Sequence, residues 1–237
     1  FDQNMITSGR WFLTVACGFS SYFTIPWVIG LIGLIWLALT AAVLTEVLEL
    51  KDPVTITVVS GLLVSFPALA STFAYVFTMD GYMLALFLAV LAVLLTAKYP
   101  RGYLAGAVCL AFSMGIYQAY LPFTILLCVY KILLYFMEEK GWKEKAKYVC
   151  HYLGMGIAGG VLYYVILQIL LKLQGKVLDT YQGINSMEQM GSGMGILATI
   201  KEMYVDFLAF TVHGNVLVNN IFSLAACIIL VATVVSM

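Results

Sequence analysis

The stretch "IPWVIGLIGLIWLALTAAVL" (residues 25–44) decides the fold class of this 237-residue chain. It contains no charged residue, and its length of about 20 residues is what an α-helix needs to cross the hydrocarbon core of a bilayer. The whole chain is similarly apolar, with 63% hydrophobic and 10% charged residues, whereas soluble domains carry about 25% charged residues. We therefore predict an all-α integral membrane protein.

Further apolar runs extend this prediction to about seven transmembrane helices. Pro67 interrupts one of the runs, so a broken or re-entrant element is expected near residues 66–80. The further runs cover residues 54–70, 82–97, 103–117, 121–136, 149–171 and 216–235.

These runs predict a single transmembrane domain over residues 1–237. Residues 1–24 are expected to form an outer loop and an interfacial helix, with Trp11 and Tyr22 at the level of the lipid headgroups. The chain has no initiator Met and ends inside an apolar run, so we expect it to be a fragment of a longer protein. The remaining parts are six spans over 25–171, a long outer loop over 172–213 and the last span over 214–237.

Lysine and arginine residues set the expected orientation. In short loops they mark the cytoplasmic side of a membrane protein, and here they gather at residues 48–53, 98–102 and 138–148. The segments expected outside the cytoplasm are therefore 1–24, 71–81, 118–121 and 172–213.

Charge balance and cysteine spacing exclude other classes of protein. Acidic and basic residues are equal at twelve each, so no nucleic-acid partner is indicated. The cysteines form no CxxC pair, and His151 and His213 are far apart. No metal site is predicted, and a requirement for a divalent cation stays open.

The run "GMGIAG" (154–159) matches the GxGxxG pattern of dinucleotide sites. That pattern needs a strand before it and a helix after it, but here it lies inside a predicted span, so we reject a dinucleotide site. Gly156 and Gly160 also form a GxxxG pair, and we expect them at a close helix contact.

The stretch "YVFTMDGYML" (75–84) places an acidic residue at the outer end of a span. A helix break at membrane depth is tolerated where the backbone lines a cavity, and an ionisable residue at such a break is a functional candidate. Two interpretations stay open for Asp80: a functional carboxylate, or the N-cap of the helix that follows.

Polar and aromatic residues at the outer ends of spans are candidates for sugar binding. The stretch "SMGIYQAYLP" (113–122) puts Tyr117 and Gln118 at the mouth of a span. Aromatic residues there are often interfacial belt residues, whereas Gln118 can hydrogen-bond a sugar. Tyr181 lies in the outer loop over 172–213, which is longer than an ordinary connector.

These motifs, taken in order, resemble those of a known family. "GRW" (9–11), "SFPALASTFAYVFTMDGYMLALFLAVLAVLL" (65–95) and "SMGIYQAYLP" follow one another as in the Gtr-type membrane glucosyltransferases of family two. Those polytopic bacterial and phage enzymes modify surface polysaccharides. They are similar to the GT-C-like glycosyltransferases, which take sugars from polyprenyl phosphates. The resemblance is clearest over residues 1–135.

The resemblance implies an active site built from the outer segments. Members of the class carry a catalytic acid in the first outer loop, which corresponds to Asp2 here, and a carboxylate can serve as base for an acceptor hydroxyl. The lipid phosphate that leaves needs a cation, and the planar guanidinium of Arg10 suits a phosphate. Asp80 is then a second catalytic carboxylate that binds sugar hydroxyls or supports the base.

The implied activity is transfer of a sugar, glucose by resemblance, from undecaprenyl phosphate or a similar carrier to a cell-surface polysaccharide. The expected location is the bacterial cytoplasmic (inner) membrane, with the active site facing outside. The alternative is a multi-span transporter or a flippase for lipid-linked sugars, because transporters also contain broken helices and polar residues near the midplane.

Overall fold

The computed structural model describes residues 2–18, 25–178, 198, 200–206 and 228, although not the side chains of residues 2–4 and 67. Every regular element within these residues is a helix, which confirms the all-α prediction for them. The chain divides into two units, residues 1–179 and 180–237, and the helices described below belong to the first unit.

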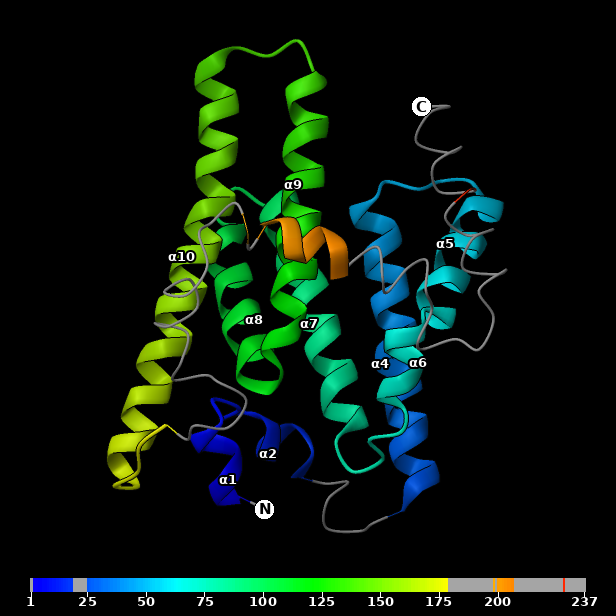
Figure 1. The fold of residues 1–237 in the computed structure, drawn as a ribbon. Coiled ribbons are helices and arrows are strands. Elements are labelled where there is room, and N and C mark those ends of the chain that lie inside the picture. Colours follow the sequence, from blue (N-terminus) through cyan, green and yellow to red (C-terminus); the bar gives the residue numbers. More distant parts are fainter. Residues whose placement is uncertain (1, 19–24, 179–197, 199, 207–227, 229–237) are drawn as a thin grey trace. The chain divides into compact units, whose positions relative to one another are not determined.

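Figure 1 labels the α-helices of this unit. In chain order the helices are α1 (Asp2–Thr7), α2 (Leu13–Ala16), α4 (Pro26–Val47), α5 (Pro53–Ser65), α6 (Pro67–Thr72), α7 (Met79–Lys98), α8 (Gly102–Ile116), the 3₁₀ helix η1 (Gln118–Tyr120), α9 (Leu121–Met137) and α10 (Trp142–Leu173).

Four helical segments of the described chain are long and apolar enough to cross a membrane: α4, α7, η1 together with α9, and α10. Helices α5 and α8 are apolar but have only 13 and 15 residues. These lengths correspond to about 20 and 22 Å, short of a hydrocarbon core of about 30 Å. The predicted span at 216–235 lies outside the described residues apart from residue 228, so the count of about seven stays a prediction.

The broken element expected near residues 66–80 is present. Helix α5 ends at Ser65, Phe66 is extended with φ −62° and ψ 125°, and α6 begins at Pro67. Proline disfavours the helical conformation in the residue before it and fits the first turn of a new helix. Residues 73–78 then lead into α7.

The connections between helices alternate between the two ends of the first unit. The α4–α5 and α9–α10 connections lie at one end, and α1, α2 and the turn before α7 lie at the other (Figure 1). This is the alternation that the charge pattern predicts. At the first end, Lys98 Nζ lies 2.8 Å from Glu46 Oε1, and the buried Lys131 pairs with Glu49. Which end faces the cytoplasm stays a prediction.

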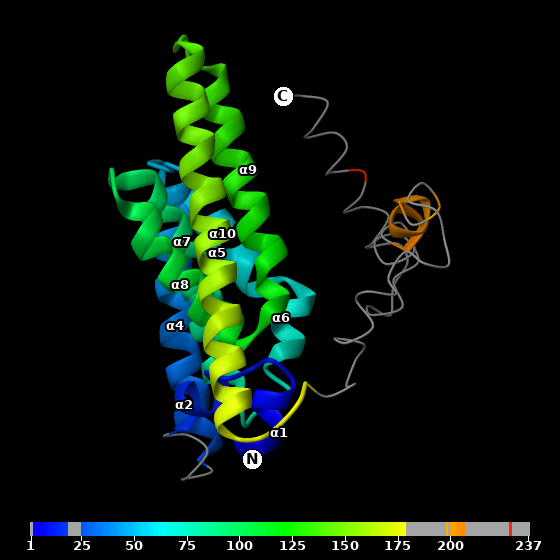
Figure 2. The ribbon, with the colours of Figure 1, turned by 90° about the vertical axis from the view of Figure 1, so that its left-hand side faces the viewer.

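Helix α7 is the centre of the packing. It contacts α4, α8, α9, α10 and α2, and Ala85, Ala89 and Ala92 along it are fully buried. Gly106 of α8 lies so close that an added Cβ would be 2.7 Å from the carbonyl oxygen of Ala92. Small side chains permit such close approach between membrane helices, and Figure 2 shows α8 and α10 running beside α7.

Hydroxyl groups reinforce this packing. Ser113 Oγ of α8 donates to the carbonyl oxygen of Ala85 at 2.8 Å, and both groups lie in the core. Thr96 Oγ1 of α7 reaches Met155 Sδ of α10 at 3.0 Å. Hydrogen bonds between membrane helices contribute about 0.6 kcal/mol each on average, so α7 is bonded as well as packed to two neighbours.

The GxxxG prediction is wrong. Cβ atoms added at Gly156 and Gly160 would meet nothing within 4 Å. Gly159 makes the contact instead, because an added Cβ there would lie 3.1 Å from the carbonyl oxygen of Ala107. Successive helical residues point about 100° apart, so the packed face of α10 follows Tyr152, Met155 and Gly159 and turns Gly156 and Gly160 away from α8.

A matched pair of substitutions tests this packing. Gly106→Ala is expected to destabilise the protein by about 1–3 kcal/mol, because an added methyl overpacks the α7–α8 contact. Gly156→Ala adds the same methyl in open space and is expected to leave stability unchanged or to raise it by up to about 1 kcal/mol, because alanine favours the helix. Thermal unfolding in detergent measures both, and equal effects of the two substitutions would contradict the assigned helix faces.

Candidate active site

The segment that joins α1 to α2 is anchored on α8. The Phe12 amide donates to the carbonyl oxygen of Gly115 at 2.8 Å, and Trp11 is 8% exposed. The Trp11 and Phe112 rings meet edge to face with centroids 5.3 Å apart. A Cβ at Gly115 would lie 2.7 Å from the Trp11 ring, so the indole occupies the space that this glycine leaves.

The structure describes residues 2–18 of the outer loop and interfacial helix expected over residues 1–24. They include α1, a turn and the four-residue helix α2, and residues 19–24 lie outside the description. Trp11 lies in a buried cluster rather than in the exposed position of a belt residue, and Tyr22 lies outside the described residues.

Arg10 is held by two tyrosines. Its Nη1 lies 3.3 Å from the hydroxyl of Tyr82, and its Cζ lies 5.2 Å from the centroid of the Tyr117 ring. The Tyr82 and Tyr117 rings stack with centroids 4.5 Å apart. A cation over an aromatic face is attracted by the ring quadrupole. No carboxylate whose side chain the structure describes forms an ion pair with Arg10.

Buried polar atoms without partners gather in the same segment. Arg10 Nε, Trp11 Nε1 and Thr14 Oγ1 have no hydrogen-bond partner among the described residues. Buried polar groups are nearly always bonded to protein, water or ligand. Residues 10–14 therefore have hydrogen-bonding capacity that the described chain does not use.

Asp80 is buried beneath this segment. It lies in the first turn of α7 with 4% exposure, and its Oδ1 accepts the Gly81 amide at 2.9 Å. The N-cap residue of α7 is Thr78, so the N-cap alternative for Asp80 is wrong, although a carboxylate in the first turn still stabilises the helix dipole. Sequence analysis thus located the helix start but not the exact cap.

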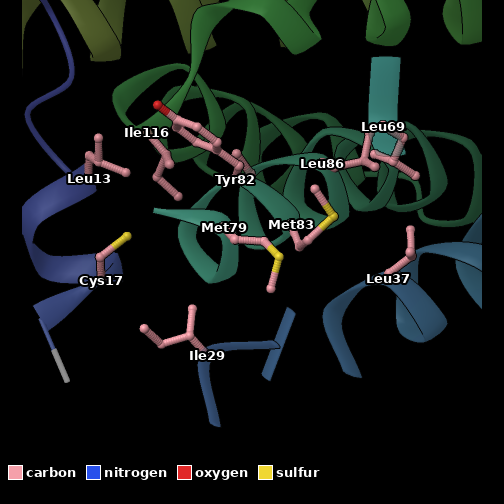
Figure 3. Packing of buried hydrophobic residues seen from close by; sticks show 11 residues of the cluster. Leu13, Cys17, Ile29, Leu37, Leu69, Met79, Tyr82, Met83, Leu86 and Ile116 are labelled. Carbon is pink, nitrogen blue, oxygen red and sulfur yellow. The ribbon is translucent and has the colours of Figure 1, made fainter. Parts of the chain in front are cut away.

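The second partner of Asp80 is Cys17 of the α2 segment. Cys17 Sγ donates to the carbonyl oxygen of Thr78 at 3.9 Å, and burial together with the neighbouring Asp80 carboxylate raises the pKa of the Cys17 thiol. Figure 3 shows Leu13 and Cys17 facing the first turns of α7, where Met79 and Tyr82 lie. Asp80 therefore attaches the α2 segment to α7 on the side away from solvent.

Gln118 and Tyr163 connect the N-terminal segment to α10. Gln118 Nε2 donates to the Tyr163 hydroxyl at 3.0 Å, and that hydroxyl donates to the carbonyl oxygen of Gly9 at 3.0 Å. One of the two N–H groups of Gln118, a residue predicted to bind a sugar, is therefore used within the protein.

An apolar cavity of about 610 Å³ lies beside the tyrosine cluster. Tyr117 lines it and also carries Arg10 on its ring. Tyr120 and Thr72 supply polar atoms in the wall. The other lining residues are Leu44, Val59, Leu62, Leu63, Phe66, Ala68, Leu69, Leu86, Ala119, Phe123 and Leu126.

The structure thus brings three predicted residues into one region: Arg10, Tyr117 and Gln118. Asp2 begins α1, but its side chain lies outside the description, as does all of Tyr181. Sequence reasoning missed Tyr82, whose only signal is its place two residues after Asp80, and Tyr163, for which the sequence holds no signal. Within the described residues no group of three or more His, Cys, Asp or Glu side chains is placed to hold a metal ion.

A family model described as glucosyl transferase GtrII matches residues 1–237. The chain belongs to the GtrII family. No curated protein and no solved structure matches it. Membership in GtrII confirms the resemblance to Gtr-type glucosyltransferases and favours a transferase over a transporter or flippase. In this GtrII protein, a candidate glucosyl transferase site is formed by Arg10, the stacked Tyr82 and Tyr117, and the apolar cavity beside them.

The environment of Cys17 predicts its reactivity. A raised pKa keeps the thiol protonated at neutral pH, and the thiolate is the form that reacts. We expect N-ethylmaleimide in detergent at pH 8 to label the exposed Cys150 and to spare Cys17 until the protein is denatured. Mass spectrometry of the peptides measures this, and equal labelling of both cysteines in folded protein would contradict the buried Cys17–Asp80 contact.

Proposed function

We propose that this GtrII protein transfers glucose from a polyprenyl phosphate, such as undecaprenyl phosphate, to a cell-surface polysaccharide on the outer side of the bacterial cytoplasmic membrane. One observation carries the proposal: Arg10, which pairs with no carboxylate among the described side chains, lies on Tyr117, which also lines an apolar cavity. A polyprenyl phosphate joins an anionic head to a long apolar chain, so the two neighbouring features match the two parts of the donor.

The role of Arg10 is to bind the donor phosphate. As the sugar leaves, negative charge grows on the phosphate oxygen, and a preorganised cation in a site of low dielectric stabilises that charge. The two stacked tyrosines hold the guanidinium before the donor arrives. Guanidinium can present two parallel N–H donors to phosphate, which an ammonium group cannot do.

The role of the cavity is to hold part of the polyprenyl chain. Its volume falls within the range of about 300–1,000 Å³ that ligand pockets occupy, and its walls are almost entirely aliphatic and aromatic. It lies between α5, α6, α7 and α9, where the break at Pro67 separates two short helices. The helix break at Pro67 thus borders the cavity that we propose for the polyprenyl chain.

The base that we propose is Asp2. The acceptor hydroxyl loses its proton to this carboxylate while its oxygen bonds to the anomeric carbon, and the bond from that carbon to the phosphate oxygen breaks with its electron pair. A single displacement of this kind needs one base and inverts the anomeric centre. Asp80 is buried against Gly81 and Cys17. Its proposed role is therefore structural: it holds the α2 segment, which follows Arg10, against α7.

The acceptor and the sugar are expected to contact the aromatic residues next to Arg10. Tyr117 offers a ring at the boundary of the cavity, and Tyr181, outside the described residues, remains a candidate from the long loop. A requirement for a divalent cation also remains part of the proposal to be tested, by adding a chelator to the transfer assay.

Substitution of Arg10 tests the phosphate site. Arg10→Ala is expected to lower kcat/KM for the lipid donor by about 10²-fold or more, the usual effect of removing one stabilising group, and Arg10→Lys is expected to restore part of it. The assay follows labelled glucose passing from polyprenyl phosphate to polysaccharide with full-length protein in detergent. The control is Arg101→Ala, an exposed arginine at the opposite end of the helices. Wild-type transfer by Arg10→Ala would overturn the proposed site.

Two carboxylate substitutions separate the proposed base from the buried acid. Asp2→Asn is expected to lower kcat by about 10²–10⁴-fold, the contribution of a general base, with KM for the donor little changed. Asp80→Asn keeps an oxygen for the Gly81 amide and is expected to retain most of the transfer. A loss of kcat in Asp80→Asn equal to that in Asp2→Asn would contradict the assignment of Asp2 alone as base.

A further inference from the structure

We infer that Tyr163 of α10 is a positioning residue for Arg10. Its hydroxyl is hydrogen-bonded to the residue before Arg10 and to the residue after Tyr117. Arg10 and Tyr117 form the cation–aromatic pair that we propose for the donor phosphate. The inference therefore rests on that proposed role of Arg10, and it adds to the donor site a residue that lies more than 150 positions after Gly9 in the sequence.

The first side is the main chain of the arginine. The Tyr163 hydroxyl donates to the carbonyl oxygen of Gly9 at 3.0 Å, and this carbonyl belongs to the peptide bond that leads into Arg10. The Arg10 amide in turn donates to the carbonyl oxygen of Met5 at 2.8 Å. Both polar atoms of the Gly9–Arg10 peptide group are thus hydrogen-bonded, the oxygen to α10 and the nitrogen to α1.

The second side is the aromatic ring. Gln118 Nε2 donates to the same hydroxyl at 3.0 Å, and Gln118 directly follows Tyr117, whose ring lies under the guanidinium. One hydroxyl group therefore connects the residue before Arg10 to the residue after Tyr117. This connection fixes the distance between the cation and the ring.

Gly9 shows how close this contact is. It has a φ of +79°, and a Cβ added to it would lie 2.7 Å from both Gln118 Nε2 and the Tyr163 hydroxyl. Glycine adopts a left-handed conformation without steric cost and allows a close approach of the backbone. The turn that presents Arg10 is consequently shaped to receive the Tyr163–Gln118 pair.

Tyr163 acts through Arg10 rather than on the substrate. A phenol has one proton to donate, and Tyr163 uses it on Gly9. Its contribution to transfer is the position of the guanidinium, and a misplacement of about 1 Å in a catalytic group can cost about 10²-fold in rate.

The test substitutes Tyr163→Phe in the full-length protein, which removes the hydroxyl and keeps the ring. We expect KM for polyprenyl-phosphate glucose to rise about tenfold, part of the loss that misplacement of a group brings, while kcat for bound donor falls less. The matched control is Tyr164→Phe, because Tyr164 is the next residue on α10 and is exposed; it is expected to behave as wild type. Gln118→Ala, which removes the same connection from its other end, is expected to reproduce the rise in KM if Tyr163→Phe does not fold.

A double-mutant cycle with Arg10→Lys decides whether the effect passes through Arg10. Residues that act as one unit give non-additive losses, so Tyr163→Phe is expected to change KM little in the Arg10→Lys background. Fully multiplicative losses, or a wild-type KM in both Tyr163→Phe and Gln118→Ala, would overturn the inference while leaving the role of Arg10 intact. Wild-type kinetics in Arg10→Lys and Arg10→Ala would instead overturn the proposed function itself.

Discussion

The close packing of α7 against its neighbours is the constraint on which the rest of the first unit depends. Membrane lipid is as apolar as the helices, so association relies on tight contact and hydrogen bonds rather than on burial from water. Fully buried alanines along α7 and Gly106 on α8 supply that contact. The first turns of α7 then carry Asp80, which holds the α2 segment, and Tyr82, which holds Arg10. The position of the arginine is thus a consequence of how α7 is packed.

The surroundings of Arg10 determine which kind of ligand it can bind. Two tyrosines hold the guanidinium, and no carboxylate whose side chain the structure describes pairs with it. A cation kept in this way favours an anionic ligand, and the neighbouring cavity favours an apolar one. Membership in GtrII supports glucosyl transfer, and a lipid phosphate combines the two ligand properties in one molecule. Chemistry and packing therefore point to the same proposed donor.

The sequence predicted features that depend on local chemistry. The apolar run at 25–44 lies almost entirely in α4. The helix break predicted at Pro67 is present, because proline disfavours the helical conformation of the residue before it. The sequence could not predict which face of a helix packs, because a single residue step turns the side chain by about 100°. Gly159 therefore takes the contact expected of Gly156, and Tyr163 rather than its identical neighbour Tyr164 meets Gly9. Partners far apart in sequence, such as Gln118 and Tyr163, leave no local pattern.

Photo-crosslinking tests the central claim, that Arg10 and the apolar cavity bind the two parts of one lipid donor. The probe is a polyprenyl phosphate with a diazirine in the apolar chain, bound to full-length protein in membranes. The account predicts labelling of cavity residues such as Leu69 and Phe123, which unlabelled donor suppresses and Arg10→Ala abolishes. Labelling confined to exposed side chains such as Leu31 and Val161, unaffected by unlabelled donor, would contradict it.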